Sequence, residues 1–261
     1  MLDYQLMPKK CASLIQDADY VIAFTGAGIS TAAGIPDFRS PQGIYTTRQF
    51  DPRTFDLQYF LKHPDAFYRF AQELIDILRS TQPTYTHQFL AQLESHHLIN
   101  GIITQNIDAL HQMAGTKNII ELHGSYYSAS CIRCNVFRES NLDIDWWQDK
   151  IVHSPRSPVP ICPRCDGVIK PGMVFFGEPV LDMEKARDWI SRCDLMLVLG
   201  SSLNVYPAAL IPQLADATIV VVNKGSVSLA PARDRYFVDS DVDVYFQQVA
   251  QYLGIDNIDS E

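Results

Sequence analysis

The stretch GAGISTAAGIPDFRS, residues 26–40, decides the fold. It follows the apolar run YVIAF, residues 20–24, which ends at Thr25. A run of β-branched and aromatic residues that stops at small residues is typical of a buried strand leading into a turn. Gly26 and Gly28 allow a tight turn and a close approach of a ligand to the backbone. Backbone N–H groups and a helix N-terminus after such a turn suit a pyrophosphate, so we expect a phosphate-binding turn here.

The second half of this stretch carries more chemistry than a phosphate-binding turn requires. Residues 36–39 place an acid, an aromatic ring and a fixed cation beside the expected phosphates. The dehydrogenase fingerprint needs a third glycine and an acid about 20 residues further on. Thr31 occupies the third-glycine position, and no acid cleanly ends a second strand. The pattern therefore argues against a conventional hydride-transfer dehydrogenase.

The composition indicates an ordinary globular protein with room for one large or two modest domains. Apolar residues make up 47% and charged residues 20% of the 261 residues, as in soluble proteins generally. The chain starts without an apolar signal core, and no stretch approaches the roughly 18 apolar residues of a membrane span. We therefore expect a cytoplasmic protein without a membrane partner. The net charge of −9 argues against general nucleic-acid binding and suits a peptide partner that carries lysines.

Strands and helices alternate along most of the chain, which predicts an α/β fold with a doubly wound, parallel, Rossmann-like sheet. The expected strands are 20–25, 98–104, 118–122, 195–199, 219–222 and 236–238, and the expected helices are 9–18, 86–97, 183–192, 207–215 and 241–252. The Rossmann-like domain would comprise 1–40, 84–124 and 173–254, with a helical part of a smaller domain at 41–83, an inserted module with little core of its own at 125–172, and a loose acidic tail at 255–261.

Several of the expected strands end at glycines or polar side chains. These ends are 26–30, 105–108, 123–124, 200–202 and 223–225. Ligands of an open α/β sheet bind beyond the carboxyl ends of its strands. The sequence therefore predicts one composite site at this edge.

Four of the six cysteines form two CxxC pairs, Cys131 with Cys134 and Cys162 with Cys165. Redox or structural pairs are the alternative, but two pairs 27 residues apart favour one closed zinc site. Four thiolates leave no open position, so the zinc stabilises a module that is short of core and does not catalyse. A zinc ribbon that touches DNA is the lesser interpretation in so acidic a chain.

One of the seven histidines stands out by its position. His123 directly follows an expected buried strand and precedes a glycine. An imidazole near its ordinary pKa suits general-base catalysis near neutral pH, although a structural role is the alternative. For the other histidines we expect solvated or satisfied side chains: His63, His87, His96, His97, His111 and His153.

In combination, the motifs resemble those of the sirtuin family of NAD-dependent protein deacylases, in particular its bacterial and archaeal deacetylases. The resemblance spans about residues 10–250. It rests on GAGIS (26–30), GIPDFR (34–39), TQNID (104–108), HG (123–124), both CxxC pairs, VFFGE (174–178), GSSL (200–203), VYP (205–207) and Asn223.

The resemblance implies that NAD is a co-substrate and zinc a structural metal. NAD would contact Gly26, Ala27, Gly28, Ser30, Asp37, Phe38, Arg39, Tyr45, Gln105, Asn106, Ile107, Asp108, Gly200, Ser201, Ser202, Asn223, Lys224, Gly225, Asp241 and Val242. The acyl-lysine peptide would add as a strand to Val174, Phe175, Phe176, Gly177, Leu203, Asn204 and Val205. The catalytic residues would be Asn106, at the nicotinamide ribose, and His123, as general base.

The implied reaction is deacetylation of a protein lysine, which gives nicotinamide, free lysine and O-acetyl-ADP-ribose. Sirtuins that remove acidic acyl groups carry a Tyr-x-x-Arg pair, whereas this chain has Tyr68 followed by Ala71. Without a cation at that position we expect neutral acyl groups, acetyl first. Protein ADP-ribosyltransfer and non-catalytic NAD binding remain the alternatives, and His123 favours deacylation.

Overall fold

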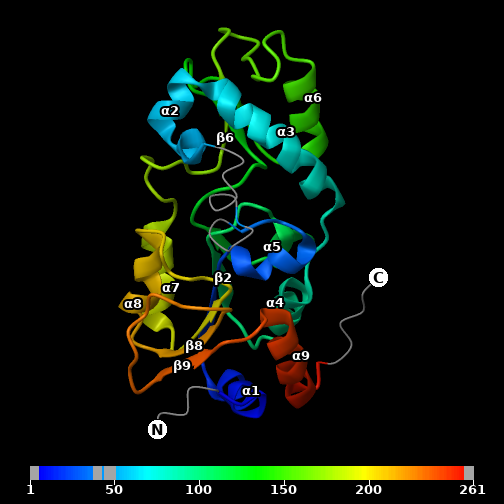
Figure 1. The fold of residues 1–261 in the computed structure, drawn as a ribbon. Helices are drawn as coiled ribbons and strands as arrows, with labels where there is room; N and C mark the ends of the chain where they lie inside the picture. The colour runs from blue at the N-terminus through cyan, green and yellow to red at the C-terminus, as the bar shows by residue number, and fades with distance from the viewer. Residues whose placement is uncertain (1–5, 38–42, 44–50, 256–261) are drawn as a thin grey trace. The chain divides into compact units, whose positions relative to one another are not determined.

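The computed structural model describes residues 6–37, 43 and 51–255, and the chain divides into two compact units (Figure 1). The first unit lies within Met1–Ala33, Gln82–Leu122 and Asp182–Glu261, and the second within Gly34–Thr81 and His123–Leu181. The segments 41–83 and 125–172, which were expected to be separate modules, fall together in the second unit, except for residues 82–83. Among the described residues, no helix is long and apolar enough to cross a lipid bilayer.

The first unit is built on a six-stranded parallel sheet with the order β3-β2-β1-β7-β8-β9. The strands are β1 (Val21–Thr25), β2 (Gly101–Thr104), β3 (Ile119–Glu121), β7 (Leu195–Leu199), β8 (Thr218–Val222) and β9 (Arg235–Val238). Every residue of β1, β2 and β7 is buried, as expected of central strands that are covered on both faces. In register, Thr25 lies beside Thr104 on one side and Leu199 on the other. Three strands therefore end at the same level.

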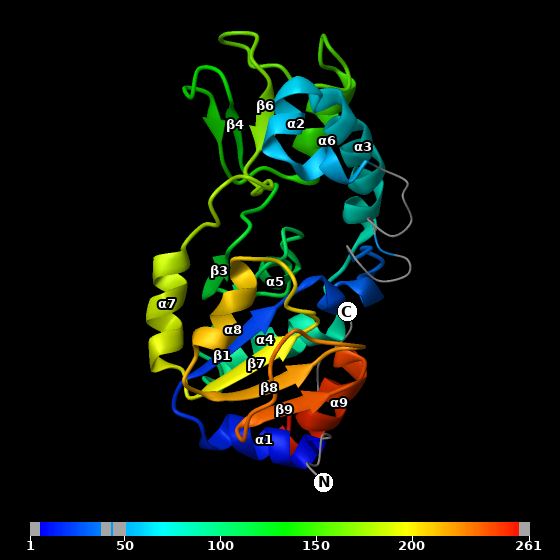
Figure 2. The same ribbon diagram turned by 60° about the vertical axis from the view of Figure 1, so that its left-hand side comes forward.

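Helices cover both faces of this sheet (Figure 2). They are α1 (Pro8–Asp17), α4 (Tyr85–Ser95), α5 (Leu110–Met113), α7 (Met183–Arg192), α8 (Ile211–Leu214) and α9 (Val242–Leu253). The apolar faces of α1, α4 and α9 share one core with alternate strand residues such as Val21 and Ala23. At the start of β2, α7 packs so closely that a Cβ on Gly101 would lie 2.5 Å from the Trp189 ring. The expected doubly wound parallel sheet is confirmed.

One local expectation for this unit is wrong, and a second is met by a helix whose first turn is 3-10. The turn after β1 leads into the short 3-10 helices η1 (Ala27–Ile29) and η2 (Thr31–Ala33), not into an α-helix that could direct its N-terminus at a phosphate. The expected helix 207–215 begins as the 3-10 helix η4 (Ala208–Leu210) before α8. Short 3-10 turns carry the same local spacing of apolar residues as one turn of α-helix, so the sequence pattern does not separate them.

The second unit combines helices with a small antiparallel sheet, β5-β4-β6. Its elements are η3 (Pro52–Phe55), α2 (Leu57–Lys62), α3 (Pro64–Ser80), β4 (Ala129–Cys131), β5 (Arg138–Glu139), α6 (Ile144–Val152) and β6 (Ile169–Pro171). Helix α3 begins at Pro64 with Asp65 in its first turn. Proline is suited to this position because its missing N–H would have no helical partner.

The segment 125–172 has more core than the sequence suggested. Trp147 and Ile151 of α6 and Ile169 of β6 are buried, and the Trp147 ring stacks on Tyr68 of α3 with ring centroids 6.4 Å apart. The expectation of a module with little core is therefore wrong. Residues far away in the sequence supply the missing apolar side chains, which composition within one segment cannot reveal.

Candidate functional site

Three glycines pack against one another where β1 and β7 end. A Cβ on Gly28 would lie 2.7 Å from the Gly200 Cα atom, and one on Gly26 would lie 2.9 Å from the Gly200 carbonyl oxygen. Gly200 has a φ of +58°, and its own Cβ would lie 2.4 Å from the Ile29 nitrogen. Real side chains do not fit at such distances, so the turn requires glycine for backbone packing.

The same packing engages the N–H groups that were expected to hold phosphates. Gly26 N donates to the Leu199 carbonyl at 3.0 Å, and Gly28 N donates to the Gly200 carbonyl at 2.9 Å. Among the described residues, Ala27 N has no such partner. The expectation that several N–H groups of this turn cradle a pyrophosphate therefore needs correction. The glycines allow the backbone segments to pack closely, and the N–H group of Ala27 is the one left available as a donor.

Ser30, Asn106 and Asp108 form a buried hydrogen-bonded network beside this turn. Ser30 Oγ donates to Asp108 Oδ2 at 2.7 Å, and Asn106 Nδ2 donates to Ser30 Oγ and to the Gly26 carbonyl, both at 3.2 Å. Ser30, Asn106 and Asp108 are at most 7% exposed. Asn106 uses its side-chain N–H groups internally, and its Oδ1 atom accepts no hydrogen bond from the described residues. The structure thus brings together three of the predicted site residues from two different strand ends.

Burial raises the pKa of Asp108 above its ordinary value, against the opposing hydrogen bonds from the Ser30 hydroxyl and the Leu110 N–H. Burial also raises the pKa of Glu121, at the end of β3, and the charge of Asp108 raises it further. Two carboxyl groups are thus held in poorly solvated positions in the first unit. A buried carboxylate interacts strongly with any donor that reaches it, because little water competes.

A second network lies behind the first and was missed by the sequence analysis. Thr25 Oγ1 donates to Thr104 Oγ1 at 2.8 Å, and Thr104 Oγ1 accepts the Asn106 N–H at 3.0 Å. His111 Nε2 lies 3.0 Å from Thr25 Oγ1. His111 is 1% exposed and His87 is fully buried, although both were expected to be ordinary helix histidines. The available signal is the pair of threonines that end two otherwise apolar strands.

The other predicted NAD-contact residues of the first unit lie at the ends of β2, β7 and β8 and at the start of α9. Gln105 Nε2 donates to Ser201 Oγ at 3.0 Å, and Lys224 Nζ donates to Asp241 Oδ2 at 2.8 Å. Burial would raise the pKa of Asp241, but the Lys224 contact and the Val244 N–H outweigh it, so the pKa is lowered. The remaining members are Ile107, Ser202, Asn223, Gly225 and Val242, in the same loops or at the first residue of α9.

Leu203, Asn204 and Val205 follow β7 in the first unit. Leu203 is fully buried with a φ of +54°, so its side chain belongs to the core. Ser228 Oγ donates to Asn204 Oδ1 at 2.5 Å. Of the three, Asn204 is exposed and Val205 half-buried. Only these two present side chains to solvent.

His123 belongs to the second unit, and the glycine beside it fixes its backbone. Gly124 has a φ of +60°, and a Cβ there would lie 2.2 Å from the Gly172 carbonyl oxygen. The His123 carbonyl accepts the Val174 N–H at 2.8 Å. The imidazole is half-buried. His123 is thereby tied to residues 174–177, the predicted peptide-binding residues of this unit.

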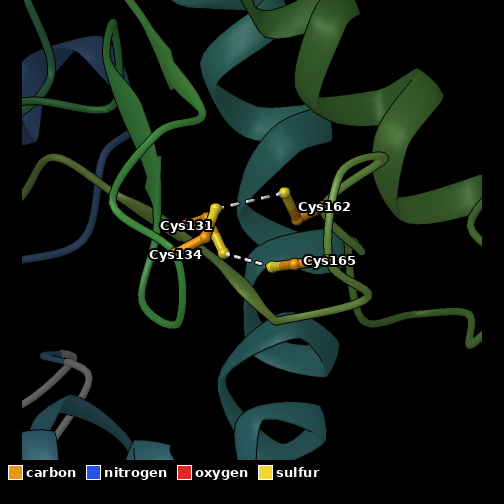
Figure 3. A group of neighbouring side chains, drawn as sticks. All are labelled: Cys131, Cys134, Cys162 and Cys165. Atoms are coloured by element: carbon orange, nitrogen blue, oxygen red, sulfur yellow. Dashed lines mark hydrogen bonds between the residues drawn. The ribbon is translucent and has the colours of Figure 1, made fainter.

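The four CxxC cysteines meet in one cluster (Figure 3), with their sulfur atoms within 4.8 Å of one another. Tetrahedral zinc with Zn–S bonds of 2.3 Å places sulfurs about 3.8 Å apart. Arg133 N and Arg164 N each point at the first sulfur of their CxxC, at 3.4 and 3.5 Å. Hydrogen bonds from the Phe137 and Val136 N–H groups lower the pKa of Cys134 to about 6, whereas the pKa of Cys165, despite an opposing backbone hydrogen bond, is raised to about 12 by burial and the neighbouring cysteine thiols. The cluster therefore fits a closed structural zinc site.

Some predicted residues cannot be placed. Phe38, Arg39 and Tyr45 lie outside the described residues. Asp37, the last residue described before them, is half-buried in the second unit.

Sequence and structure comparisons both find similar proteins in one family. Residues 26–207 match the Sir2 family. The chain is 43% identical over 222 residues to an NAD-dependent protein deacetylase of Thermotoga maritima, covering 83% of this chain and 87% of that one. It is 39% identical over 248 residues to that of Saccharolobus solfataricus, covering 93% and 96%. A structure of Sir2 with a p53 peptide and NAD+ has a TM-score of 0.85 at 38% identity and covers 96% of this chain and 100% of that one.

Proposed function

The chain belongs to the Sir2 family, and on this basis we propose that it is an NAD-dependent protein-lysine deacetylase. It consumes NAD, an acetyl-lysine side chain and water, and releases nicotinamide, free lysine and O-acetyl-ADP-ribose. One observation carries the proposal within the molecule: Ser30, Asn106 and Asp108 are joined in a buried network at the strand ends, where an open α/β sheet binds its ligands.

The buried network is suited to hold a carboxamide such as that of nicotinamide. The Asp108 carboxylate accepts from an amide N–H, and the Asn106 Oδ1 atom is a second acceptor nearby. Ser30 holds both side chains, since it donates to one and accepts from the other. NAD would supply an electrophilic ribose carbon as its bond to nicotinamide breaks, and the amide oxygen of the acetyl-lysine would form the new bond to that carbon. Acceptors that are fixed before the reaction stabilise such a change without having to reorganise.

His123 is the proposed general base. Its imidazole would accept a proton from a ribose hydroxyl, and the hydroxyl oxygen would then form a bond to the acyl carbon while the bond from that carbon to the lysine nitrogen eventually breaks. A positioned base of this kind contributes about 10²–10⁴-fold to the rate. The hydrogen bond between the His123 carbonyl and the Val174 N–H ties the base to the segment that we propose binds the peptide.

We propose neutral acyl groups, with acetyl preferred. Tyr68 is fully buried, and its hydroxyl donates to the Ile169 carbonyl. A tyrosine that satisfies a core carbonyl is not available to a substrate carboxylate. Ala71 adds no cation, and Arg69 forms an exposed ion pair with Asp65. We expect no removal of succinyl groups.

The proposed partners are acetylated proteins, not membranes or nucleic acids. The acidic composition suits lysine-bearing peptides. We infer that the protein works in the cytoplasm, because four closely spaced thiols that must remain reduced to hold zinc suit a reducing compartment.

Incubation with NAD and an acetyl-lysine peptide tests the proposal by mass spectrometry. We expect deacetylated peptide, nicotinamide and O-acetyl-ADP-ribose in equal amounts. The His123→Ala variant should lose most turnover while still binding NAD. Transfer of ADP-ribose to protein, or turnover that survives His123→Ala, would contradict the mechanism, and NAD binding without turnover by the unaltered protein would contradict the function.

A further inference from the structure

Residues 175–178 of the second unit form a tight turn. Glu178 N donates to the Phe175 carbonyl at 3.0 Å, and Gly177, at the third position, has a φ of +95°. That is the position at which a type II turn needs glycine. Phe175 is 1% exposed, whereas Phe176 is 48% exposed. The turn therefore anchors one aromatic ring in the core and presents the next to solvent.

The side chain of Glu178 adds a second hydrogen bond between the two ends of this turn. Glu178 Oε2 accepts the Phe175 N–H at 2.7 Å. The same oxygen lies 2.8 Å from Lys170 Nζ. Glu178 thus joins the first residue of the turn to strand β6, which contains Lys170.

Lys170 is buried, and each hydrogen of its ammonium group has an acceptor. Nζ donates to the Met173 carbonyl at 2.7 Å and the Pro171 carbonyl at 3.1 Å, in addition to Glu178. It also lies 4.3 Å from the centroid of the Phe175 ring. Burial lowers the pKa of Lys170, and Glu178 opposes this change. One side chain therefore connects the whole segment from β6 to the turn.

An ion pair between a buried lysine and a half-buried glutamate is poorly explained by stability alone. Desolvation of two charges offsets much of their attraction, and apolar replacements of the same volume are often as stable or more so. A charge-assisted pair does impose distances and directions that an apolar contact does not. The arrangement therefore favours a geometric role.

The backbone that the Lys170–Glu178 pair fixes has N–H and carbonyl groups that could form hydrogen bonds with a peptide. On one side, Phe176 N donates to the Phe55 carbonyl at 2.8 Å, and Leu57 N donates to the Phe176 carbonyl at 3.0 Å. Among the described residues, the Val174 carbonyl and the Gly177 N–H have no partner. An added strand needs such an acceptor and donor. The Gly177 carbonyl likewise accepts no hydrogen bond from the described residues, so three backbone groups of the predicted strand-addition set in this unit remain available.

We propose that Lys170 and Glu178 are positioning residues for the acyl-lysine peptide. They fix the Val174 carbonyl, the Phe176 side chain and the Gly177 N–H in the arrangement that the peptide backbone meets. This inference rests on the proposed function. In this proposal the Lys170–Glu178 pair, which contacts no substrate itself, controls the affinity for the peptide. The affinity for NAD does not depend on the pair.

Binding of a fluorescein-labelled acetyl-lysine peptide, measured by anisotropy, tests the proposal together with the Michaelis constants for peptide and NAD. Lys170→Met and Glu178→Ala should each weaken peptide binding by about tenfold or more, the effect of one charge-assisted hydrogen bond. The Michaelis constant for NAD should remain within about twofold. Lys170→Arg should restore most of the peptide affinity. Arg69→Gln, which removes an exposed ion pair of the same unit, is the matched control and should change neither constant.

Glu178→Gln keeps the shape and an acceptor for the Phe175 N–H, so it tests the pair even where Lys170→Met does not fold. It should weaken peptide binding less than Glu178→Ala. Variants that lose melting temperature but keep the peptide affinity of the unaltered protein would overturn the positioning role alone. Absence of peptide binding by the unaltered protein would overturn the proposed function as well.

Discussion

The rings of His87 and His111 lie face to edge with their centroids 4.7 Å apart. His87 Nδ1 accepts the Thr84 N–H at 3.2 Å, which leaves Nε2 as its protonated nitrogen. His111 Nε2 contacts Thr25 Oγ1, whose hydrogen goes to Thr104, so Nε2 donates and Nδ1 is the acceptor. Within the described part of the chain, His87 Nε2 and His111 Nδ1 have no hydrogen-bond partner. The two neutral rings thus present a donor and an acceptor in one buried place.

This pair makes the first unit sensitive to acid. Burial lowers the pKa of His111 to about 3, and burial and the neighbouring ring lower that of His87 well below its usual value. Below about pH 6.5, His87 and His111 bind protons in the unfolded chain but not in the folded chain. The free energy of unfolding therefore falls as the pH falls. The slope is at most about 1.4 kcal/mol per pH unit for each histidine. Urea unfolding between pH 7.5 and pH 5, followed by circular dichroism, measures it.

Variants identify which histidine makes the free energy of unfolding depend on pH. His111→Gln should be less stable at pH 7.5 but lose less stability on acidification than the unaltered protein. His153→Gln is the control, since that side chain is 74% exposed, and it should leave the slope unchanged. Equal slopes for the His111 variant and the unaltered protein would show that the buried pair is not responsible.

The hydroxyl of Ser30 should matter for NAD far more than that of its neighbour. Ser30→Ala removes the group that joins Asn106 to Asp108 and leaves the carboxylate without its 2.7 Å donor. A hydrogen bond to a charged group contributes about 1.5–3 kcal/mol, so kcat/KM for NAD should fall by roughly 10- to 100-fold. Thr31→Ala is the control, because the exposed Thr31 hydroxyl donates only to the Gly28 carbonyl. Similar values of kcat/KM in both variants would refute the network's role.

Much of the fold could be predicted because its strands are short, apolar and bounded by small or polar residues. The predicted strand 195–199 and helix 183–192 have the observed bounds. The missed helix α6 has an Asp143 N-cap, but two adjacent tryptophans beside a proline-rich segment obscured its pattern. Its core partner Tyr68 lies far away in sequence. Long-range packing of this kind leaves no local signal.

The candidate site could be predicted where a sequence motif marks its residues. It could not be predicted where backbone hydrogen bonds and packing determine what a residue does. The cysteine spacing alone indicates the cluster that the structure contains. By contrast, nothing in the sequence shows that Gly26 and Gly28 donate their N–H groups to the neighbouring strand end. Likewise, the burial of His87 and His111 depends on how α4 and α5 pack. Tertiary contacts of this kind change the role of a residue without changing its motif.

Removal of the proposed zinc should unfold part of the second unit and spare the first. Cys162→Ser removes one of four ligands, and without the metal the two CxxC segments lose the link that holds them together. Hydrogen exchange should accelerate in β4 and β6, while β1 and β7 keep their protection. Elemental analysis should find about one zinc per chain in the unaltered protein. Unchanged exchange in β4 after chelation would contradict a structural metal.

The glycine beside His123 offers a direct test of how the proposed base is held. Gly124→Ala adds a methyl group 2.2 Å from the Gly172 carbonyl oxygen at a φ of +60°, so the backbone of His123 must shift. A misplacement of about 1 Å costs roughly 100-fold in rate, and we expect a loss of that order in kcat with NAD binding retained. Gly254→Ala is the matched control, because Gly254 has a φ of +70° and nothing within 4 Å of the new methyl group. It should lower stability by about 1–2 kcal/mol without changing kcat. If both variants keep full activity, the contact between Gly124 and Gly172 does not position His123, and its placement must come from its own side-chain contacts.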